Sequence, residues 1–280
     1  MYLQSLASAV PATAFTQQQC WDIFESSSIR KELKSKTSLL VRKILLGKSG
    51  VTKRHFALNN VDTLFDLDAE ALNQAFEKEA PALASKALEK ALHRANLKPE
   101  ELDGLFICTC TGYICPGITS HVAESLGMKP STFLQDLVGL GCGADFPTLR
   151  PAAHMLAAHP DQKNLKVAVI AVEVCSAAFF LDNDLGVIIS ACIFGDGASA
   201  SIWGQQPGPS GLRASGFDTV HSPEEREFIR FVNSQGKLRN RLHRSVPDRA
   251  VRAVASLWDR RPEASSQDRI LSHGGGRDVS

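Results

Sequence analysis

The sequence has almost no excess of charge of either sign, because 31 lysines and arginines against 30 aspartates and glutamates leave a formal net charge of +1. A general nucleic-acid binder needs a basic excess to neutralise phosphates, so this balance argues against that class of protein. No apolar run is long enough to cross a bilayer. The first residues also lack the basic start and long apolar stretch of a secretory signal. These absences predict a cytoplasmic protein with no membrane or nucleic-acid partner.

Paired metal-ligand motifs are missing as well. The seven cysteines are an odd number, and none of them forms a CxxC pair. No clustered histidines join Cys108, Cys110 and Cys115 to complete a zinc site. In a chain of this size without a secretory signal, such cysteines are expected to be reduced thiols. The sequence therefore predicts no metal site.

Apolar runs typical of strands alternate with segments of helical periodicity, and 44% of the 280 residues are hydrophobic. The pattern predicts strands over residues 105–108, 132–138, 167–172 and 198–202, and helices over 80–97, 119–126, 145–158 and 184–190. Residues 167–172 are apolar on both faces, as in a strand whose sheet is covered on two sides. Alternating strands and helices of this kind predict an α/β fold.

A glycine- and proline-rich stretch, residues 205–211, interrupts this alternation. It predicts a domain boundary that divides the chain into residues 1–204 and 205–280. Beyond the boundary, the pattern predicts a strand over 216–221, a helix over 246–258 and a short strand over 269–272.

Cys142 is the first candidate for chemistry. It lies in the segment Gly-Leu-Gly-Cys-Gly-Ala-Asp, between a predicted strand and a predicted helix. The unpaired N–H groups and the dipole at a helix N-terminus favour a thiolate over a thiol. The flanking glycines let a substrate or the backbone approach closely. The competing interpretation is an inert cysteine that only packs.

Three other segments are candidates for a site. His273 follows a predicted strand and precedes three glycines, so it would act on Cys142 across a cleft or simply occupy a loop. Phe194, Gly195 and Asp196 join two apolar runs, and the simplest interpretation is a turn whose aspartate bonds the backbone. Residues 47–49 and 51–54 carry Lys48, Lys53 and Arg54, which would meet a phosphate or form solvated basic turns.

Taken in order, these segments resemble the motifs of type III polyketide synthases, the chalcone-synthase-like branch of the thiolase superfamily. The matching segments are residues 48–56 (Lys-Ser-x-Ile-x-Lys-Arg-Tyr in the family), 108–117 (Cys-Thr-Thr-Ser-Gly-x-x-x-Pro-Gly), 141–144 (the nucleophile), 173–174 (Ser-Glu-Val), 194–198 (Phe-Gly-Asp-Gly-Ala), 236–239 (Gly-His-Leu-Arg), 246–247 (Val-Pro) and 273–276 (His-Pro-Gly-Gly). They cover nearly the whole chain.

The resemblance implies a thiolase-like fold, two related α/β halves in α-β-α-β-α layers, and an acyltransferase. Cys142 would carry a starter acyl group taken from CoA, and His273 would activate the thiol and bind the enolate oxygen. Malonyl-CoA would be decarboxylated, and its carbanion would attack the Cys142 thioester in a Claisen condensation. CoA thioesters would be substrates, and no cofactor is implied.

The same resemblance assigns roles to residues around the nucleophile. Phe194 would separate the CoA tunnel from the cavity, with Gly195 beside it, and Cys110 and Cys175 would line the substrate cavity. Lys48 would meet CoA phosphates as a point charge. The protein is expected to be a homodimer, with the loop of residues 108–117 near the two-fold axis.

Several positions depart from the family pattern. The family's other two CoA-binding cations align with Val41 and Ile44, although Arg42 and Lys43 are adjacent. Cys175 replaces a cavity threonine, and Cys115 replaces a methionine that reaches into the partner subunit. The second gatekeeper phenylalanine has no aromatic counterpart between residues 236 and 246.

The family's catalytic triad ends in an asparagine well downstream of the histidine, but Ser280 ends this sequence seven residues after His273. The second half is therefore expected to be incomplete. Two alternatives remain. A β-ketoacyl-carrier-protein synthase III shares the fold and the cysteine, but there Gln-Ala-Asn usually follows the histidine instead of three glycines. A catalytically inactive, truncated homologue is the other.

Overall fold

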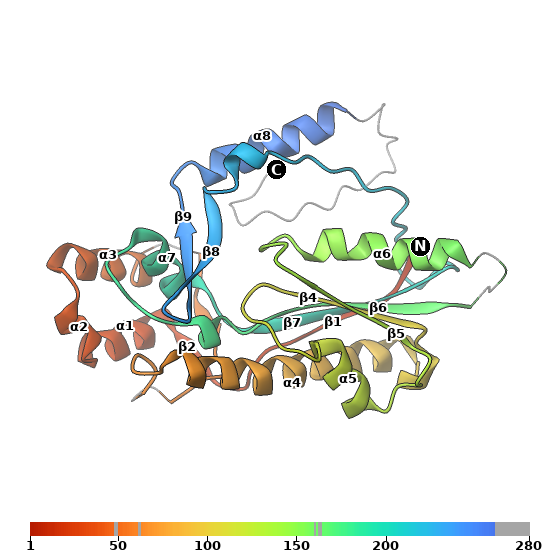
Figure 1. Ribbon diagram of the computed structural model, residues 1–280, viewed down its shortest axis with the longest axis horizontal. Helices are drawn as coiled ribbons and strands as arrows, with labels where there is room; N and C mark the ends of the chain where they lie inside the picture. The colour runs from red at the N-terminus through yellow and green to blue at the C-terminus, as the bar shows by residue number, and fades with distance from the viewer. Residues whose placement is uncertain (48–49, 61–62, 160, 162–163, 261–280) are drawn as a thin grey trace.

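A computed structural model describes residues 1–47, 50–60, 63–159, 161 and 164–260. A five-stranded sheet lies at its centre, with α4 (Ala69–Ala95) and α5 (Ile118–Leu126) on one face and α6 (Asp145–Ala158) on the other (Figure 1). The molecule is thus an α/β structure, as the alternating pattern predicts. Among the described residues, no helix is both long and apolar enough to cross a membrane.

The central sheet mixes parallel and antiparallel strands in the order β1-β7-β6-β4-β5. Its strands are β1 (Tyr2–Ala9), β4 (Gly104–Thr109), β5 (Phe133–Val138), β6 (Lys166–Glu173) and β7 (Gly197–Gly204). Strands β5, β4 and β6 run parallel, whereas β7 is antiparallel to both β6 and β1. The carboxyl ends of three neighbouring strands therefore open at the same edge of the sheet.

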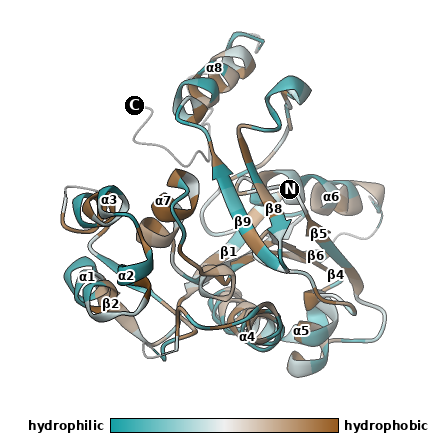
Figure 2. Ribbon diagram, turned by 60° about the vertical axis from the view of Figure 1, so that its left-hand side comes forward, coloured by the Kyte–Doolittle hydropathy of each residue, from teal (hydrophilic) through white to brown (hydrophobic). Residues whose placement is uncertain are grey.

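The inner strands β4 and β6 are buried on both faces of the sheet, which explains their uninterrupted apolar runs. Along β6, Ala168, Ile170 and Val172 join the core under α4, whereas Val167 and Val169 join the core under α6. This alternation is the two-residue period of a strand. The hydropathy colouring is accordingly brown along much of β4, β5 and β6 (Figure 2).

A helical group packs beside the sheet around a second apolar cluster. Its helices are α1 (Gln17–Ser26), α2 (Ile29–Glu32), α3 (Ser35–Leu45) and α7 (Leu185–Ile193). The short strands β2 (Ala14–Thr16) and β3 (Lys53–His55) pair next to it. Thr16 caps α1, because its hydroxyl accepts from the N–H of Gln19 and the Gln19 side chain accepts in return from the N–H of Thr16.

Beyond residue 204 the chain forms a hairpin of β8 (Ile229–Ser234) and β9 (Lys237–Leu242), and then α8 (Val246–Asp259). The helix predicted over 246–258 is confirmed. The strand predicted over 216–221 is wrong, because these residues form no strand; Arg150 on α6 donates instead to Phe217 O and to the Thr219 hydroxyl. The domain boundary after residue 204 stays a prediction, as does the strand over 269–272, which lies outside the described residues.

Candidate active site

The candidate site forms where the parallel strands end. Cys110 follows β4, Cys142 lies beyond β5, and Cys175 follows β6. The register pairs Thr109 with Val138 across β4 and β5, so these ends are level. Loops that leave adjacent parallel strands at one edge come together, which is why residues distant in sequence meet here.

A glycine-rich turn presents the Cys142 thiol. Gly139 and Gly141 have φ values of +79° and +76°, a region that residues with a Cβ rarely adopt. The turn ends at Ala144, and α6 begins at Asp145, three residues after Cys142. The helix predicted over 145–158 is therefore confirmed, and the thiol lies just before its N-terminus. Cys142 is exposed.

Cys110 is held beside Cys142 by a half-buried carboxylate. Glu173, at the end of β6, accepts from the backbone N–H of Cys110 at 2.9 Å and from the Thr111 hydroxyl at 2.7 Å. The Thr109 hydroxyl donates to the same carboxylate at 3.2 Å. Burial raises the pKa of Glu173 above its usual range, and these hydrogen bonds partly offset the effect. The carboxylate therefore fixes the backbone on which Cys110 sits.

The two neighbouring thiols have opposite pKa shifts. The interaction with Cys110 lowers the pKa of Cys142 to about 7, although partial desolvation of the sulfur and the charge of Glu173 oppose this. The pKa of Cys110 is raised, first by that interaction and then by burial. The opposite shifts favour the thiolate at Cys142 and the protonated thiol at Cys110. Burial raises the pKa of Cys108 to about 11 and that of Cys192 to about 12, so Cys142 is far more ionised than either at neutral pH.

Steric contacts fix the loop after β4. A Cβ on Gly112 would lie 2.4 Å from the Phe76 ring, and one on Gly117 would lie 2.3 Å from the Asp136 carboxylate. Asp136 also accepts from the backbone N–H of Thr119, 3.2 Å away, at the start of α5. The glycines of this loop are thus required by close packing.

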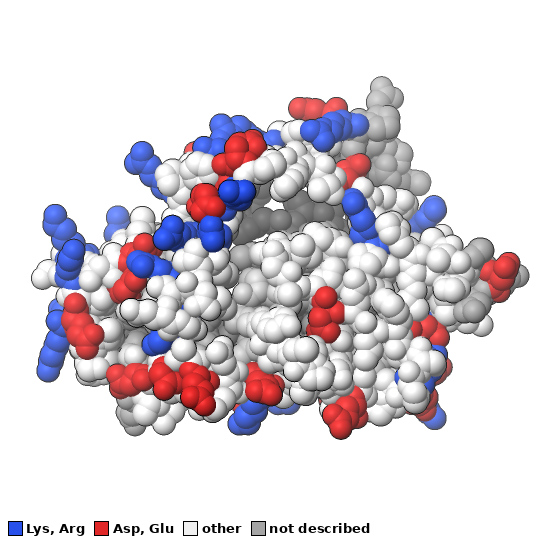
Figure 3. Space-filling model, in the orientation of Figure 1, with Lys and Arg blue, Asp and Glu red and all other residues white. Residues whose placement is uncertain are grey.

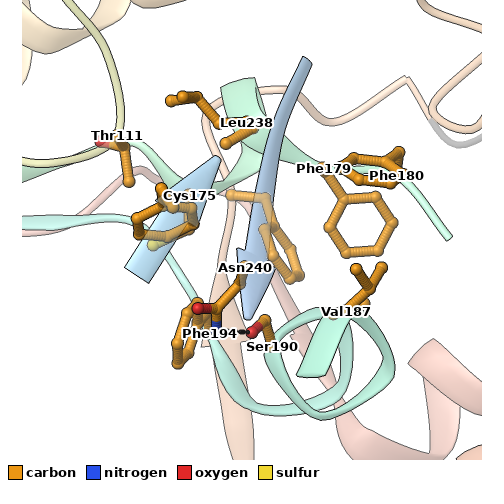
Figure 4. A pocket seen from close by; sticks show the side chains of 13 residues that line it. Thr111, Cys175, Phe179, Phe180, Val187, Ser190, Phe194, Leu238 and Asn240 are labelled. Atoms are coloured by element: carbon orange, nitrogen blue, oxygen red, sulfur yellow. Dashed lines mark hydrogen bonds between the residues drawn. The ribbon is translucent and has the colours of Figure 1, made fainter. Parts of the chain in front are cut away.

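A pocket lies beside these cysteines, between the end of β6, helix α7 and the hairpin (Figure 4). Cys175 and Thr111 line it near the strand ends, and Phe194 lines it from the end of α7. Its volume is about 30 Å³, room for about one water-sized group. This space is smaller than an acyl chain, so occupation by one requires the lining side chains to move.

The segment that carries Phe194 is anchored by Asp196. This buried carboxylate accepts from the backbone N–H groups of Ala57 at 2.7 Å and Ser176 at 2.8 Å, and from the Ser176 hydroxyl. The interpretation of an aspartate that bonds backbone is thus confirmed. Gly195 packs against β3, where its Cβ position lies 3.3 Å from His55 O, and it is not among the residues that line the pocket.

Arg54 is a structural residue rather than a phosphate ligand. It is 6% exposed, and it donates to the carbonyls of Ala191 at 2.7 Å and Phe194 at 3.0 Å. Its Nε donates to Gln17 Oε1, and its guanidinium lies over the Phe56 ring. A cation placed there complements the carbonyl end of α7. Both interpretations of this basic turn were therefore wrong for Arg54, although the adjacent Lys53 is exposed.

The expected coenzyme contacts are only partly described. Lys48 lies outside the described residues, as does His273. Val41 is buried and Ile44 packs against the same cluster, whereas Arg42 and Lys43 are exposed on α3. Figure 3 shows lysines and arginines at the end of the molecule where α1, α2 and α3 lie. Arg42 and Lys43 are thus each one position away from Val41 and Ile44, the positions that align with the cations of the family pattern.

The structure adds residues that the sequence pattern did not single out. Phe231 on β8 supplies an aromatic wall to the pocket, and Leu238 and Asn240 on β9 line it as well. Phe231 lies upstream of residues 236–246, the segment that has no aromatic counterpart of the family's second gatekeeper. The sequence did carry a signal for the hairpin. Phe231 and Asn233 lie two residues apart before the Gln-Gly turn, and Leu238 and Asn240 lie two residues apart after it, which is the spacing of one strand face.

Comparisons with known proteins agree with this architecture. A solved structure of 1,3,6,8-tetrahydroxynaphthalene synthase from Streptomyces coelicolor A3(2) superposes with a TM-score of 0.81 at 22% identity, covering 92% of this chain and 73% of that one. The type III polyketide synthase domain of Steely1 from Dictyostelium gives a TM-score of 0.77, also at 22% identity, covering 92% and 72%. At this identity the likeness shows the fold, which is thiolase-like as the resemblance implied.

Sequence comparisons point the same way. The 1,3,6,8-tetrahydroxynaphthalene synthase of Streptomyces griseus is 28% identical over 242 residues, covering 86% of this chain. The α-pyrone synthesis polyketide synthase-like Pks18 of Mycobacterium tuberculosis is 28% identical over 82% of this chain. The chain spans 63% and 62% of the lengths of these two relatives. The family model for FAE1/type III polyketide synthase-like proteins matches residues 8–212. This chain therefore belongs to the FAE1/type III polyketide synthase-like family.

Proposed function

We propose that this protein transfers an acyl group from a CoA thioester to Cys142 and extends it with malonyl-CoA. The observation that carries the proposal is the exposed Cys142 thiol, which a glycine turn presents just before α6 at the edge where three parallel strands end. The thiolate attacks the thioester carbonyl, the C–S bond to CoA breaks, and CoA leaves as a thiolate that takes up a proton.

Extension follows from the same site. Malonyl-CoA loses CO₂, and the electron pair of the broken C–C bond forms an enolate. Its carbon attacks the Cys142 thioester carbonyl, a new C–C bond forms, and the Cys142 thiolate leaves. A donor must face the enolate oxygen in this step, and His273 is the residue expected to supply it.

The coenzyme would approach across α3. Arg42 and Lys43 are exposed there, near Lys48 in sequence, and cations of this kind bind phosphates. The match of the family model favours this branch over a β-ketoacyl-carrier-protein synthase III. A catalytically inactive homologue remains the alternative, and loading of Cys142 decides between the two.

Incubation with a radiolabelled short-chain acyl-CoA is expected to load close to one acyl group per chain. Cys142→Ala should abolish the label, because it removes the only acceptor thiol with a lowered pKa among the described residues. Cys115→Ala, which removes another exposed thiol, should retain it. Peptide mass spectrometry locates the acyl group. Absence of loading in the unaltered protein would establish the inactive homologue.

We also expect a homodimer that forms through β5, one of the two edge strands of the central sheet. An unpaired edge is a template for a second strand, and apolar side chains are exposed along and beside it. These are Tyr113, Phe133, Leu134, Val138 and Leu140. Phe133→Lys together with Val138→Lys should convert the dimer to a monomer in light scattering. Leu39→Lys changes an exposed leucine on α3 and should leave the dimer intact. A monomeric unaltered protein at high concentration contradicts the expectation.

A further inference from the structure

We infer that Asn240 and Ser190 form a polar anchor that selects an acyl chain bearing a hydroxyl or enol group. This inference rests on the proposed function, because it concerns the chain held in the pocket beside Cys142. Both residues line that pocket, Asn240 from β9 and Ser190 from α7. Figure 4 shows the Asn240 amide directed at Ser190.

The fold builds this pair through close contact of α7 with β9. Gly186 lies one helical turn before Ser190 on α7, and a Cβ there would lie 2.9 Å from Asn240 O and 2.8 Å from Leu242 N. Only glycine lets the strand approach this near. Arg239 adds ion pairs to Asp182 at 3.0 Å and Asp184 at 3.3 Å. The position of Asn240 relative to α7 is thus fixed by backbone contact and by charge.

Hydrogen bonding fixes the direction of the amide. The Ser190 hydroxyl has one proton, which it donates to Gly186 O at 2.8 Å. It must therefore accept from Asn240, so the amide presents Nδ2 to Ser190. Oδ1 consequently points away from Ser190, as Figure 4 shows. An amide oxygen is an acceptor only, so it recognises a group that donates, such as a hydroxyl or an enol O–H.

The surroundings make this acceptor selective. Asn240 is 6% exposed, and the adjacent pocket walls are the apolar side chains of Val187, Phe194 and Phe231. Burial of an amide oxygen against a plain hydrocarbon chain leaves it without a partner, which costs free energy. A chain with a suitably placed O–H restores the partner. A site built this way rejects the analogue that lacks the polar group.

Binding to the Cys142→Ala protein tests the anchor without any chemistry at the nucleophile. Dissociation constants are measured by calorimetry for hexanoyl-CoA, 3-hydroxyhexanoyl-CoA and 6-hydroxyhexanoyl-CoA. One hydroxylated ester should bind about ten-fold more tightly than hexanoyl-CoA. Asn240→Leu and Asn240→Ala, each combined with Cys142→Ala, should abolish that preference and leave hexanoyl-CoA binding unchanged or tighter. Ser190→Ala should reduce the preference, because it frees the amide to turn.

Asn73→Leu is the matched control, since Asn73 is an exposed asparagine on α4, away from the pocket; it should keep the ten-fold preference. The inference is overturned if neither hydroxylated ester binds better than hexanoyl-CoA. It is also overturned if the Asn240 variants weaken all three esters equally, which is the result of a residue that only docks the hairpin. Acyl loading of the unaltered protein is scored separately. Failure to load, with the binding preference intact, would refute the proposed function and leave the anchor standing.

Discussion

At pH 7, iodoacetamide is expected to alkylate Cys142 first, and Cys110→Ala should slow that alkylation about 50-fold. The thiolate is the reacting species, and a pKa of about 7 makes about half of Cys142 ionised at this pH. The Cys110 hydrogen bond is the largest cause of that pKa. Without it, burial and the charge of Glu173 move the pKa toward or above the ordinary value of 9.0, where about 1% is ionised.

Glu173→Gln should shift the same profile in the opposite direction. The Glu173 carboxylate raises the pKa of Cys142, so removal of its charge lowers that pKa and increases alkylation at pH 6. The experiment is the rate of modification against pH, read by mass spectrometry of the Cys142 peptide. Cys115 is not among the groups that shift the pKa of Cys142, so Cys115→Ala should leave the pH profile unchanged. Identical profiles for Cys110→Ala and Glu173→Gln would contradict this electrostatic account.

Arg54→Met is expected to lower the free energy of unfolding by about 3 kcal/mol. The guanidinium makes three hydrogen bonds in a buried place, to Gln17 Oε1, Ala191 O and Phe194 O. Its removal leaves two carbonyls at the end of α7 without a donor. Arg54→Lys should give an intermediate loss, because an ammonium cannot reproduce the forked geometry of the guanidinium. Urea unfolding followed by circular dichroism measures both.

Lys53→Met is the matched control for this loss, since Lys53 is the adjacent cation on β3 and its side chain is exposed. It should change the free energy of unfolding by about 0.5 kcal/mol or less. Equal losses of unfolding free energy for Lys53→Met and Arg54→Met would mean that net charge, and not the contacts of Arg54 with carbonyls, stabilises the fold. Acyl loading of Cys142 in Arg54→Met should fall only by the fraction of protein that is unfolded. A larger fall would show that Arg54 also positions Phe194.

The elements around the candidate nucleophile were predictable because they follow local rules. The run over residues 167–172 is apolar at every position, which only a doubly covered strand requires. Glycines on both sides of Cys142 mark a turn between a strand and a helix, and α6 begins where that turn predicts. The Gly-Asp-Gly turn likewise predicts an aspartate that bonds backbone, although not which N–H groups it meets.

Elements outside the central sheet were less predictable. The hairpin β8–β9 carries charged residues at several positions, and its strand pattern is correspondingly weak. The segment over 216–221 has a strand-like composition, but no strand pairs with it, and Arg150 bonds only one of its carbonyls, that of Phe217. A composition favourable to a strand becomes a strand only where a partner edge is available.

The sequence by itself determined the α/β class, the nucleophile candidate and the family, because each depends on residues close together in the chain. Only the tertiary structure decided which neighbouring thiol lowers the pKa of Cys142, that Arg54 caps a helix, and that Asn240 faces a pocket. These facts depend on residues between 32 and 140 positions apart. Strands β4, β5 and β6 bring the cysteines together because they are parallel and end at one edge, and a pKa depends on that proximity and on burial. Packing of β3 and β9 against α7 brings Arg54 and Asn240 to their partners.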